Sequence, residues 1–133
     1  MRLVLDTNVI ISAFINPAGT PSQILKLIIS RKAELCFNAA ILSEYEGVAL
    51  RPKFSGKIDP AKIKRFIDLL NTIGVSINPP PGRVKLIDES DRIFYDTAKA
   101  SGSVLITGNT RHFPREPFIV SPVDFLKQAK NII

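Results

Sequence analysis

Short apolar runs alternate with longer amphipathic segments along the whole chain. A short apolar run bounded by polar or turn-forming residues is typical of a buried strand. Such runs occupy residues 2–5, 34–37, 75–77, 103–107 and 118–120. Most of the segments between them carry apolar residues at the three- and four-residue spacing of a helix. The pattern therefore predicts strands and helices in alternation.

The expected helices begin and end at residues with capping or turn chemistry. We expect Thr20 to be the N-cap of a helix whose first position is Pro21. The remaining helical segments are an apolar one over 8–14, one from Asn38 to about Leu50, one from Asp59-Pro60 to Gly74, one from Ser90 to Ser101, and a last one from Ser121-Pro122. This order favours an α/β domain with a mostly parallel sheet covered on both faces. No repeat or long linker divides the chain, so we expect a single domain over residues 1–133.

Composition adds charge and compartment to this picture. The chain has 133 residues, of which 45% are hydrophobic, and a formal net charge of +6. The apolar share is enough for a packed core, and the basic excess suggests a polyanionic partner. Cys36 is the only cysteine, which excludes an internal disulfide and a cysteine-based zinc site. No run approaches the ~20 apolar residues of a membrane span, and Asp6 comes too early for a signal peptide. We therefore expect a cytoplasmic protein.

Acidic and amide side chains stand near the predicted strand ends. In an open parallel sheet, ligands bind beyond the carboxyl ends of the strands. Asp6 closes the first strand, and Asn109 follows the fourth. Asp88 and Asp91 lie at the start of the helix that leads into the fourth strand, and Glu44 shares the apolar face of the helix after the second. These side chains could converge on one edge of the sheet.

Each of these residues also has a structural explanation. Asp6 and Asp88 could cap the helices that follow them, Asn109 could be a left-handed turn residue, and Glu44 could lie at an exposed edge of its helix face. Together these residues suggest a cation site, because carboxylates that are gathered in one place repel one another and usually hold a cation. All-oxygen ligands select Mg²⁺ or Mn²⁺, which suits a phosphodiester substrate. Nearby groups that could orient the acids are Thr7, Asn8, Ser12 and Thr107.

The basic residues are concentrated in one stretch. Residues 51–65 contain six basic side chains and one acidic side chain. The candidates for contacts with nucleic-acid phosphates are Arg51, Lys53, Lys57, Lys62, Arg65 and Arg111, with Arg83, Lys85 and Arg115 as further ones. A solvated helix face is the alternative explanation. His112, the only histidine, is expected to be structural or to contact phosphate, because nothing near it in sequence forms a catalytic triad.

Four segments resemble the PIN-domain family, metal-dependent ribonucleases that include the VapC-type toxins of toxin–antitoxin pairs. The segments are 5–12, 42–48, 88–94 and 104–109, in the family's order over nearly the whole chain. By position, the resemblance implies that Asp6, Glu44 and Asp91 are the catalytic, metal-binding acids. The family's fourth acid is replaced here by Asn109, whose amide oxygen can still bind a metal but brings no charge. Asp88 is the acid that we expect to compensate, ahead of Asp96.

The resemblance further implies a three-layer α/β/α sandwich around a parallel sheet of about five strands. The implied reaction is hydrolysis of RNA phosphodiester bonds with Mg²⁺ or Mn²⁺. The implied partners are a second copy of the chain in a homodimer and, for a toxin, a cognate antitoxin that blocks the site. The loss of charge at Asn109 keeps an alternative open, namely a PIN-like RNA-binding module with weak or no catalysis. A receiver-type phosphoacceptor domain is disfavoured, because Asn78-Pro79 rather than an acid follows the middle strand.

Overall fold

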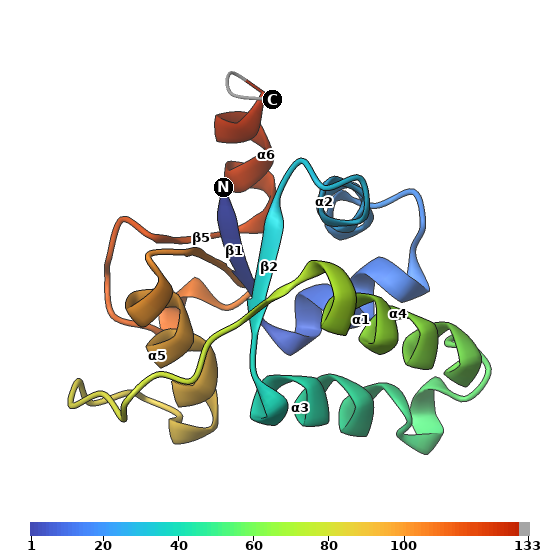
Figure 1. Ribbon diagram of the computed structural model, residues 1–133, viewed down its shortest axis with the longest axis horizontal. Coiled ribbons are helices and arrows are strands. Elements are labelled where there is room, and N and C mark those ends of the chain that lie inside the picture. The colour runs from blue at the N-terminus through green and yellow to red at the C-terminus, as the bar shows by residue number, and fades with distance from the viewer. Residues whose placement is uncertain (131–133) are drawn as a thin grey trace.

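A five-stranded parallel sheet forms the centre of the molecule (Figure 1). The computed structural model describes residues 1–130. The strands are β1 (Arg2–Leu5), β2 (Glu34–Phe37), β3 (Val75–Ser76), β4 (Val104–Ile106) and β5 (Ile119–Val120). Their order is β3-β2-β1-β4-β5, and all four neighbouring pairs are parallel. Each strand lies within a run that the apolar pattern predicts.

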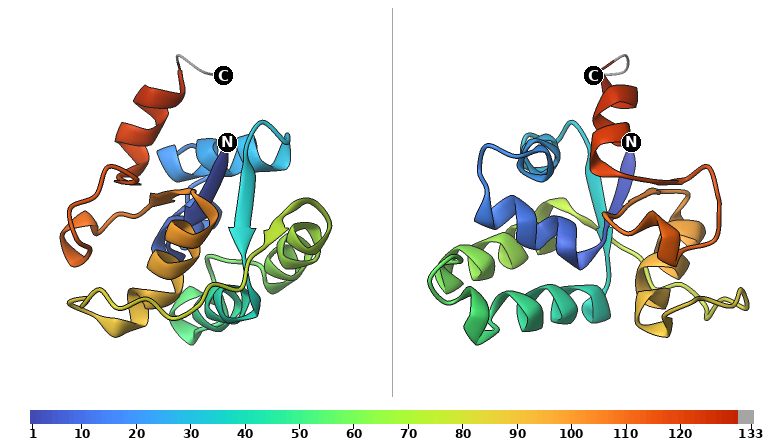
Figure 2. Two further views of the ribbon diagram at one scale, coloured as in Figure 1. Left: turned by 60° about the vertical axis from the view of Figure 1, so that its left-hand side comes forward. Right: turned by 180° about the vertical axis from the view of Figure 1, so that it is seen from behind.

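Helices cover both faces of this sheet. They are α1 (Thr7–Ile15), α2 (Thr20–Ile29), α3 (Ala39–Ala49), α4 (Pro60–Ile73), α5 (Arg92–Ser101) and α6 (Pro122–Ala129). Helix α5 packs on β1, β2 and β4 from one side, and α1, α3 and α4 lie together on the other (Figures 1 and 2). Helix α6 packs beside α2. The fold is therefore the expected three-layer α/β/α sandwich. None of the helices within residues 1–130 is long and apolar enough to cross a membrane.

The capping signals in the sequence explain most helix boundaries. Asn38 accepts a hydrogen bond from the Ile41 amide at 3.0 Å, and Asp59 accepts one from the Ala61 amide at 2.9 Å. Gly102 ends α5 with a φ of 66°, a left-handed conformation that glycine adopts without steric cost. The expected N-cap at Thr20 is wrong. Gly19 is the N-cap, because its amide closes a turn onto the Asn16 carbonyl and so places Thr20 in the first helical turn.

The core is continuous across the sheet because the central strands are apolar and buried after their exposed first residues, Arg2 in β1 and Glu34 in β2. Leu3, Val4 and Leu5 of β1 are at most 1% exposed, since α5 covers one face of the strand and α1 follows on the other. Phe94 and Ala98 of α5 face inward as the helical spacing predicts. This packing fixes β1 and α5, the two elements that end or begin at the acidic residues.

The strand order reverses between β1 and β4. The chain moves from β1 outward through β2 to β3, and after crossing the sheet it moves from β4 outward to β5. The loops that leave β1 and β4 therefore diverge, and such a switch point is where open α/β sheets bind their ligands. The Asp6 amide donates to the Ile106 carbonyl at 3.0 Å, so the first residue after β1 lies against the end of β4.

Candidate active site

Asp6 is fixed at the switch point by two hydrogen bonds. Its Oδ1 accepts from the Thr7 amide at 2.8 Å, and its Oδ2 accepts from the Thr107 hydroxyl at 2.8 Å. The first bond makes Asp6 the N-cap of α1, so the capping explanation is correct. The second bond joins the ends of β1 and β4. The carboxylate is only 6% exposed, yet each oxygen keeps a lone pair for another ligand.

Four carboxylates from three segments of the chain line one pocket of about 260 Å³ beside Asp6. They belong to Asp6, Glu44, Asp88 and Asp91. The polar groups around them are those of Thr7, Asn8, Ser90 and Asn109, and Val48 and Phe94 are the apolar lining. The pocket also contains two basic side chains, Arg51 and His112. The structure thus brings together acids that the sequence separates by up to 85 residues, from Asp6 to Asp91.

Tyr45 and Phe94 hold the two acidic helices in place below the pocket. Their rings stack with centroids 6.3 Å apart, and the Tyr45 hydroxyl donates to the Leu5 carbonyl at the end of β1. Both rings are at most 2% exposed. Because Glu44 is adjacent to Tyr45 and Asp91 lies three residues before Phe94, this contact sets the positions of both carboxylates.

Glu44 itself is exposed, at the edge of its helix face. The buried stripe of α3 runs through Ile41, Tyr45, Val48 and Ala49, and its centre lies to one side of Glu44. The expectation that Glu44 shares the apolar face is therefore wrong, and the exposed-edge alternative is correct. At that edge the carboxylate forms part of the pocket rim.

Burial and mutual repulsion perturb the acids of the pocket. Burial, followed by the charges of Asp6 and Asp88, raises the pKa of Asp91 from 3.8 to about 6. Burial also raises the pKa of Asp6, although the hydrogen bonds from Thr107 and Thr7 oppose that change. The hydrogen bonds from Ser90 lower the pKa of Asp88, whose Oδ1 accepts from both the Ser90 amide and hydroxyl. Asp88 thus caps the η2 turn (Glu89–Asp91) as the structural explanation predicts.

His112 is the pocket residue whose place could not be predicted from the sequence. It lies in the η3 turn (Thr110–His112), and its Nδ1 is 3.9 Å from Asp91 Oδ2. That distance is too long for a hydrogen bond but close enough for a protonated imidazole to attract the carboxylate. The only sequence signal is that His112 follows β4 within one short turn of Asn109. Asn109 has a φ of −121°, so the left-handed turn explanation for it is wrong.

The pocket has the donors that a hard divalent cation requires, although they are not already grouped as a binding site. No cluster of three or more His, Cys, Asp or Glu side chains within residues 1–130 is arranged to hold a metal ion. The available donors are carboxylate and amide oxygens, which Mg²⁺ and Mn²⁺ prefer. The Thr7 hydroxyl is buried beside them without a hydrogen-bond partner, and a cation's hydration water could satisfy it. The donor set therefore fits such an ion.

Three of the candidate residues, Ser12, Thr107 and Asp96, are not part of the pocket lining, and Thr107 lies fully buried behind Asp6. Ser12 is exposed one turn further along α1. Asp96 is buried on the far side of α5, where its Oδ2 accepts from the Gly82 amide at 2.9 Å. Asp96 comes five residues after Asp91, and that spacing turns its side chain away from the pocket. It therefore cannot compensate for Asn109.

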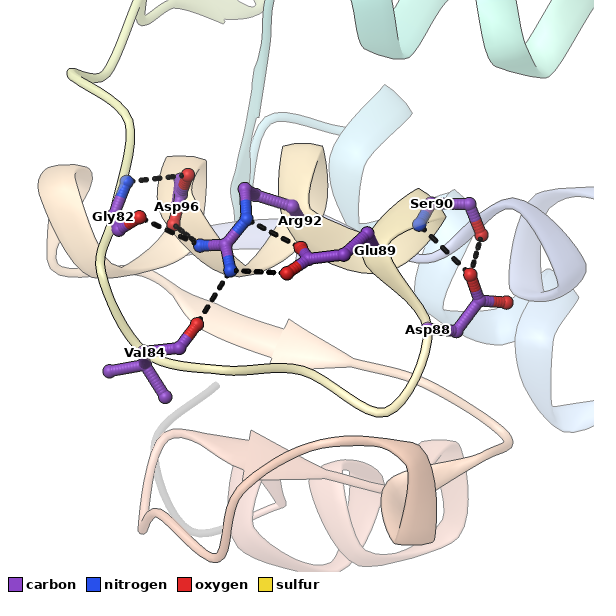
Figure 3. A network of polar contacts seen from close by, with 7 residues as sticks. All are labelled: Gly82, Val84, Asp88, Glu89, Ser90, Arg92 and Asp96. Carbon is purple, nitrogen blue, oxygen red and sulfur yellow. Dashed lines mark hydrogen bonds and ion pairs between the residues drawn. The ribbon is translucent and has the colours of Figure 1, made fainter.

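Arg92 fastens the loop that precedes Asp88 to α5 (Figure 3). Its guanidinium binds both carboxylate oxygens of Glu89 and also contacts Asp96. It donates further to the carbonyls of Gly82 at 3.1 Å and Val84 at 2.6 Å. A side chain at residue 82 would clash with Asp96 Oδ1, so this close approach requires glycine. The network holds the chain segment that places Asp88 at the rim.

The predicted phosphate-contacting residues are all exposed, but they do not form one surface with the pocket. Arg51 lines the acidic pocket itself. Lys57 and Lys62 line a separate hollow at the start of α4, and Lys53 lies over the Phe54 ring with Nζ 5.0 Å from its centroid. Arg65 is exposed on α4, and Arg111 lines a hollow on the other side of η3.

Comparison with known proteins agrees with this architecture. The family model described as "PIN domain" matches residues 2–111, which include every acidic segment of the pocket. The chain belongs to the PIN-domain family. The resemblance seen in the sequence is therefore confirmed at the level of the family.

Two individual proteins are similar to this PIN domain. "Uncharacterized protein MJ1680" of Methanocaldococcus jannaschii is 34% identical over 110 residues, which are 82% of this chain and 71% of that protein. A crystal structure of VapBC2 from Rickettsia felis, bound to a DNA fragment from its promoter, superimposes with a TM-score of 0.59. It is 17% identical and covers 91% of this chain and 97% of the matched chain. At that identity the second match shows the fold alone.

Thr107 offers a direct test of how this PIN domain controls its buried acid. Replacing Thr107 by valine removes the hydroxyl that donates to Asp6, so we expect the pKa of Asp6 to rise further. The amide of Asn109, which donates to the Thr107 hydroxyl at 3.0 Å, loses its acceptor as well. We expect the free energy of unfolding to fall by about 1–3 kcal/mol. NMR titration of the Asp6 carboxyl carbon measures the first effect, and denaturant unfolding measures the second.

The matched control is Thr72→Val, which removes an exposed hydroxyl that binds only its own helix. This variant should leave the titration of Asp6 unchanged. An unaltered Asp6 titration curve in Thr107→Val would show that the strand-to-strand hydrogen bond does not govern this carboxyl group.

Proposed function

We propose that this PIN domain is a Mg²⁺- or Mn²⁺-dependent endoribonuclease that hydrolyses RNA phosphodiester bonds. The observation that carries the proposal is the convergence of four carboxylates on one pocket at the switch point of the sheet. Burial, and after it the repulsion from Asp6 and Asp88, raises the pKa of Asp91, and a divalent cation would relieve that repulsion. A protein with an excess of basic residues and one acidic pocket suits a polyanionic substrate that is cut at a metal.

The residues divide into those that would hold the cation and those that would hold the RNA. Asp6, Glu44 and Asp91 would be the metal-binding, catalytic acids, with Asp88 and the amide oxygen of Asn109 as additional ligands. A divalent cation supplies a Lewis acid that polarises the phosphate and lowers the pKa of water. Thr7 and Thr107 keep the Asp6 carboxylate in one orientation through their hydrogen bonds, and Asn8 stands beside them in the lining.

Basic side chains at the pocket would hold the substrate. Arg51 and His112 lie among the acids, where either could bind a phosphate oxygen once a cation offsets the carboxylate charge. The exposed side chains of Lys53, Lys57, Lys62 and Arg65 would contact the RNA backbone away from the pocket. These contacts do not depend on base identity.

We further propose that the protein is the toxin of a type II toxin–antitoxin pair and forms a homodimer. The support is the resemblance of its acidic segments to VapC-type toxins, together with the similarity of its fold to the VapBC2 structure. Its partner would then be a cognate antitoxin that covers the pocket. Induced expression should arrest bacterial growth, and the same induction of an Asp6→Asn variant should not. Equal growth arrest by both proteins would contradict a toxin that acts through this pocket.

The deciding experiment is cleavage of a defined RNA panel with Mg²⁺, with Mn²⁺ and with a chelator. We expect cleavage only with the metals, and a loss of at least about a hundredfold in the Asp6→Asn variant. Lys32→Gln, which changes an exposed charge just before β2, at the end of the strands opposite to the pocket, is the matched control and should cleave at the normal rate. Cleavage that resists the chelator, or that survives Asp6→Asn, would contradict the proposal.

The alternative function is a PIN-like RNA-binding module with weak or no catalysis. It is favoured by the uncharged Asn109 in the fourth acidic position and by the absence of a ready-made metal cluster within residues 1–130. It predicts salt-sensitive RNA binding without turnover. Robust cleavage by highly purified protein, sensitive to Asp6→Asn, would exclude it.

A further inference from the structure

A second hollow lies in the loop between β4 and β5. It measures about 670 Å³ and is separate from the acidic pocket. Two guanidinium side chains, those of Arg111 and Arg115, are part of its lining, together with Thr110 and Glu116. We refer to it as the arginine hollow. Its composition indicates an anionic ligand, provided that the two arginines are not neutralised by acids of the protein itself.

The arginines of the hollow have no acidic partner among the described residues. Neither Arg111 nor Arg115 forms an ion pair or a side-chain hydrogen bond within residues 1–130, and both are exposed. Glu116 is the one carboxylate in the lining, and its Oε1 is 3.3 Å from Lys99 Nζ. Because Lys99 offsets that charge, the hollow keeps the positive potential of two free guanidinium groups.

One short turn separates the arginine hollow from the acidic pocket. The η3 turn directs His112, together with the preceding Asn109, into the acidic pocket. The same turn directs Thr110 and Arg111 into the hollow. The two cavities therefore share a wall made by a single turn of chain. A flexible anionic polymer that occupies one of them can reach the other by crossing η3.

We propose that the arginine hollow binds a backbone phosphate of the RNA strand, flanking the phosphate that is cleaved in the acidic pocket. This inference rests on the proposed function, because it takes the strand in the acidic pocket to be RNA. Guanidinium groups match phosphate oxygens in a two-point geometry, and the Thr110 hydroxyl can donate to a third oxygen. The hollow would hold one phosphate of the RNA strand, so that the strand crosses η3 in a fixed position while the acids act on the neighbouring phosphate.

The lining favours the backbone over a base. Phe113 is the only aromatic residue in it and is 5% exposed, so it offers no free ring face for stacking. The remaining apolar lining is proline and isoleucine. The hollow should therefore contribute affinity without sequence preference, as phosphate contacts do.

The test measures RNA binding without catalysis. The probe is a fluorescent single-stranded RNA of roughly ten nucleotides, bound in the presence of a chelator and read by anisotropy over a range of salt concentrations. Arg111→Gln and Arg115→Gln should each weaken binding by about three- to tenfold and reduce the slope of log K against log salt by about 0.7. Lys32→Gln removes one exposed positive charge just before β2, at the opposite end of the strands, and should retain both the affinity and the slope.

The hollow and the proposed function can fail separately. If the protein cleaves no RNA but both arginine variants lose affinity and slope, the RNA-contacting hollow is supported and the nuclease proposal fails. If wild-type protein cleaves RNA and the arginine variants bind with unchanged affinity and slope, the hollow proposal is overturned. If Lys32→Gln weakened RNA binding as much as the arginine variants did, the effect would reflect net charge alone, and the hollow proposal would also be overturned. Circular dichroism of each variant confirms that it is folded.

Discussion

Replacing Asp91 by asparagine is expected to stabilise the free protein and at the same time to reduce RNA cleavage by about a hundredfold or more. The two effects have one cause. Asp91 is held close to Asp6 and Asp88, and burial together with their charges raises its pKa to about 6. Its negative charge therefore destabilises the folded protein in the absence of a cation. The same charge is what would bind the cation during catalysis.

The pH dependence of this stabilisation has a definite sign. Between the ordinary value of 3.8 and about 6, the folded protein holds the Asp91 proton more tightly than the unfolded chain does. The free energy of unfolding of the wild type therefore falls as the pH rises through that interval. Asp91→Asn has no such proton to lose, so its advantage should be fully present at about pH 8 and should vanish near pH 4.

Thermal unfolding of both proteins across that pH range, in the presence of a chelator, measures the effect. Asp68→Asn is the matched control, because it removes an exposed carboxylate on α4 far from the pocket. The control should show neither the stabilisation nor the loss of cleavage. A lower melting temperature for Asp91→Asn at about pH 8, or cleavage at the wild-type rate, would contradict this account of the pocket.

Binding of Mn²⁺ to the RNA-free protein is expected to weaken by about tenfold for each pH unit below 6. Carboxylate ligands must be ionised, so a proton competes with the cation at Asp91. Above pH 6 the affinity should level off as Asp91 becomes ionised, because the pKa of Asp88 lies below its ordinary value. Asp6, whose pKa burial also raises, adds to the proton competition at lower pH. Titration of Mn²⁺ followed by electron paramagnetic resonance, at several pH values, measures the profile.

Asn109→Asp changes the same profile in a predictable way. A further carboxylate in the pocket should increase the affinity for Mn²⁺ at high pH. It should also raise the pKa of Asp91 further, so that the midpoint moves above 6. Asp68→Asn should reproduce the wild-type profile. An affinity that stays flat between pH 5 and pH 8 would show that Asp91 is not a ligand.

Local sequence patterns predict the elements of this fold accurately. The strands and most helix boundaries depend on apolar periodicity and on capping residues such as Asn38, Asp59 and Gly102, whose effects act within a few residues. The rule that ligands bind beyond the strand ends also leads to Asp6 and Asn109. Thr20 shows the limit of such rules. A turn closed by Gly19 and Asn16 decides where α2 begins, and a capping preference cannot detect that backbone hydrogen bond.

Side-chain direction is much harder to infer from the sequence. Glu44 shares its helical spacing with buried residues but lies at the exposed edge, because the packing of Tyr45 against Phe94 sets the rotation of α3. Asp96 is only five residues from Asp91 in sequence, but it points to the opposite side of α5 and is held there by Arg92 and Gly82. The rotation of each helix about its axis cannot be inferred from the order of residues, because tertiary packing sets it.

The sequence by itself determined the alternation of strands and helices, the family, the basic charge and the acids that could bind a metal. Only the tertiary structure decided which of them meet. It brought His112 to 3.9 Å from Asp91, moved Asp96 and Ser12 out of the pocket, and placed Arg111 across η3 from the acids. The physical reason is the distance along the chain over which each effect acts. Periodicity and caps are properties of neighbouring residues, whereas a pocket forms where segments distant in sequence are fixed by the packing of the whole core.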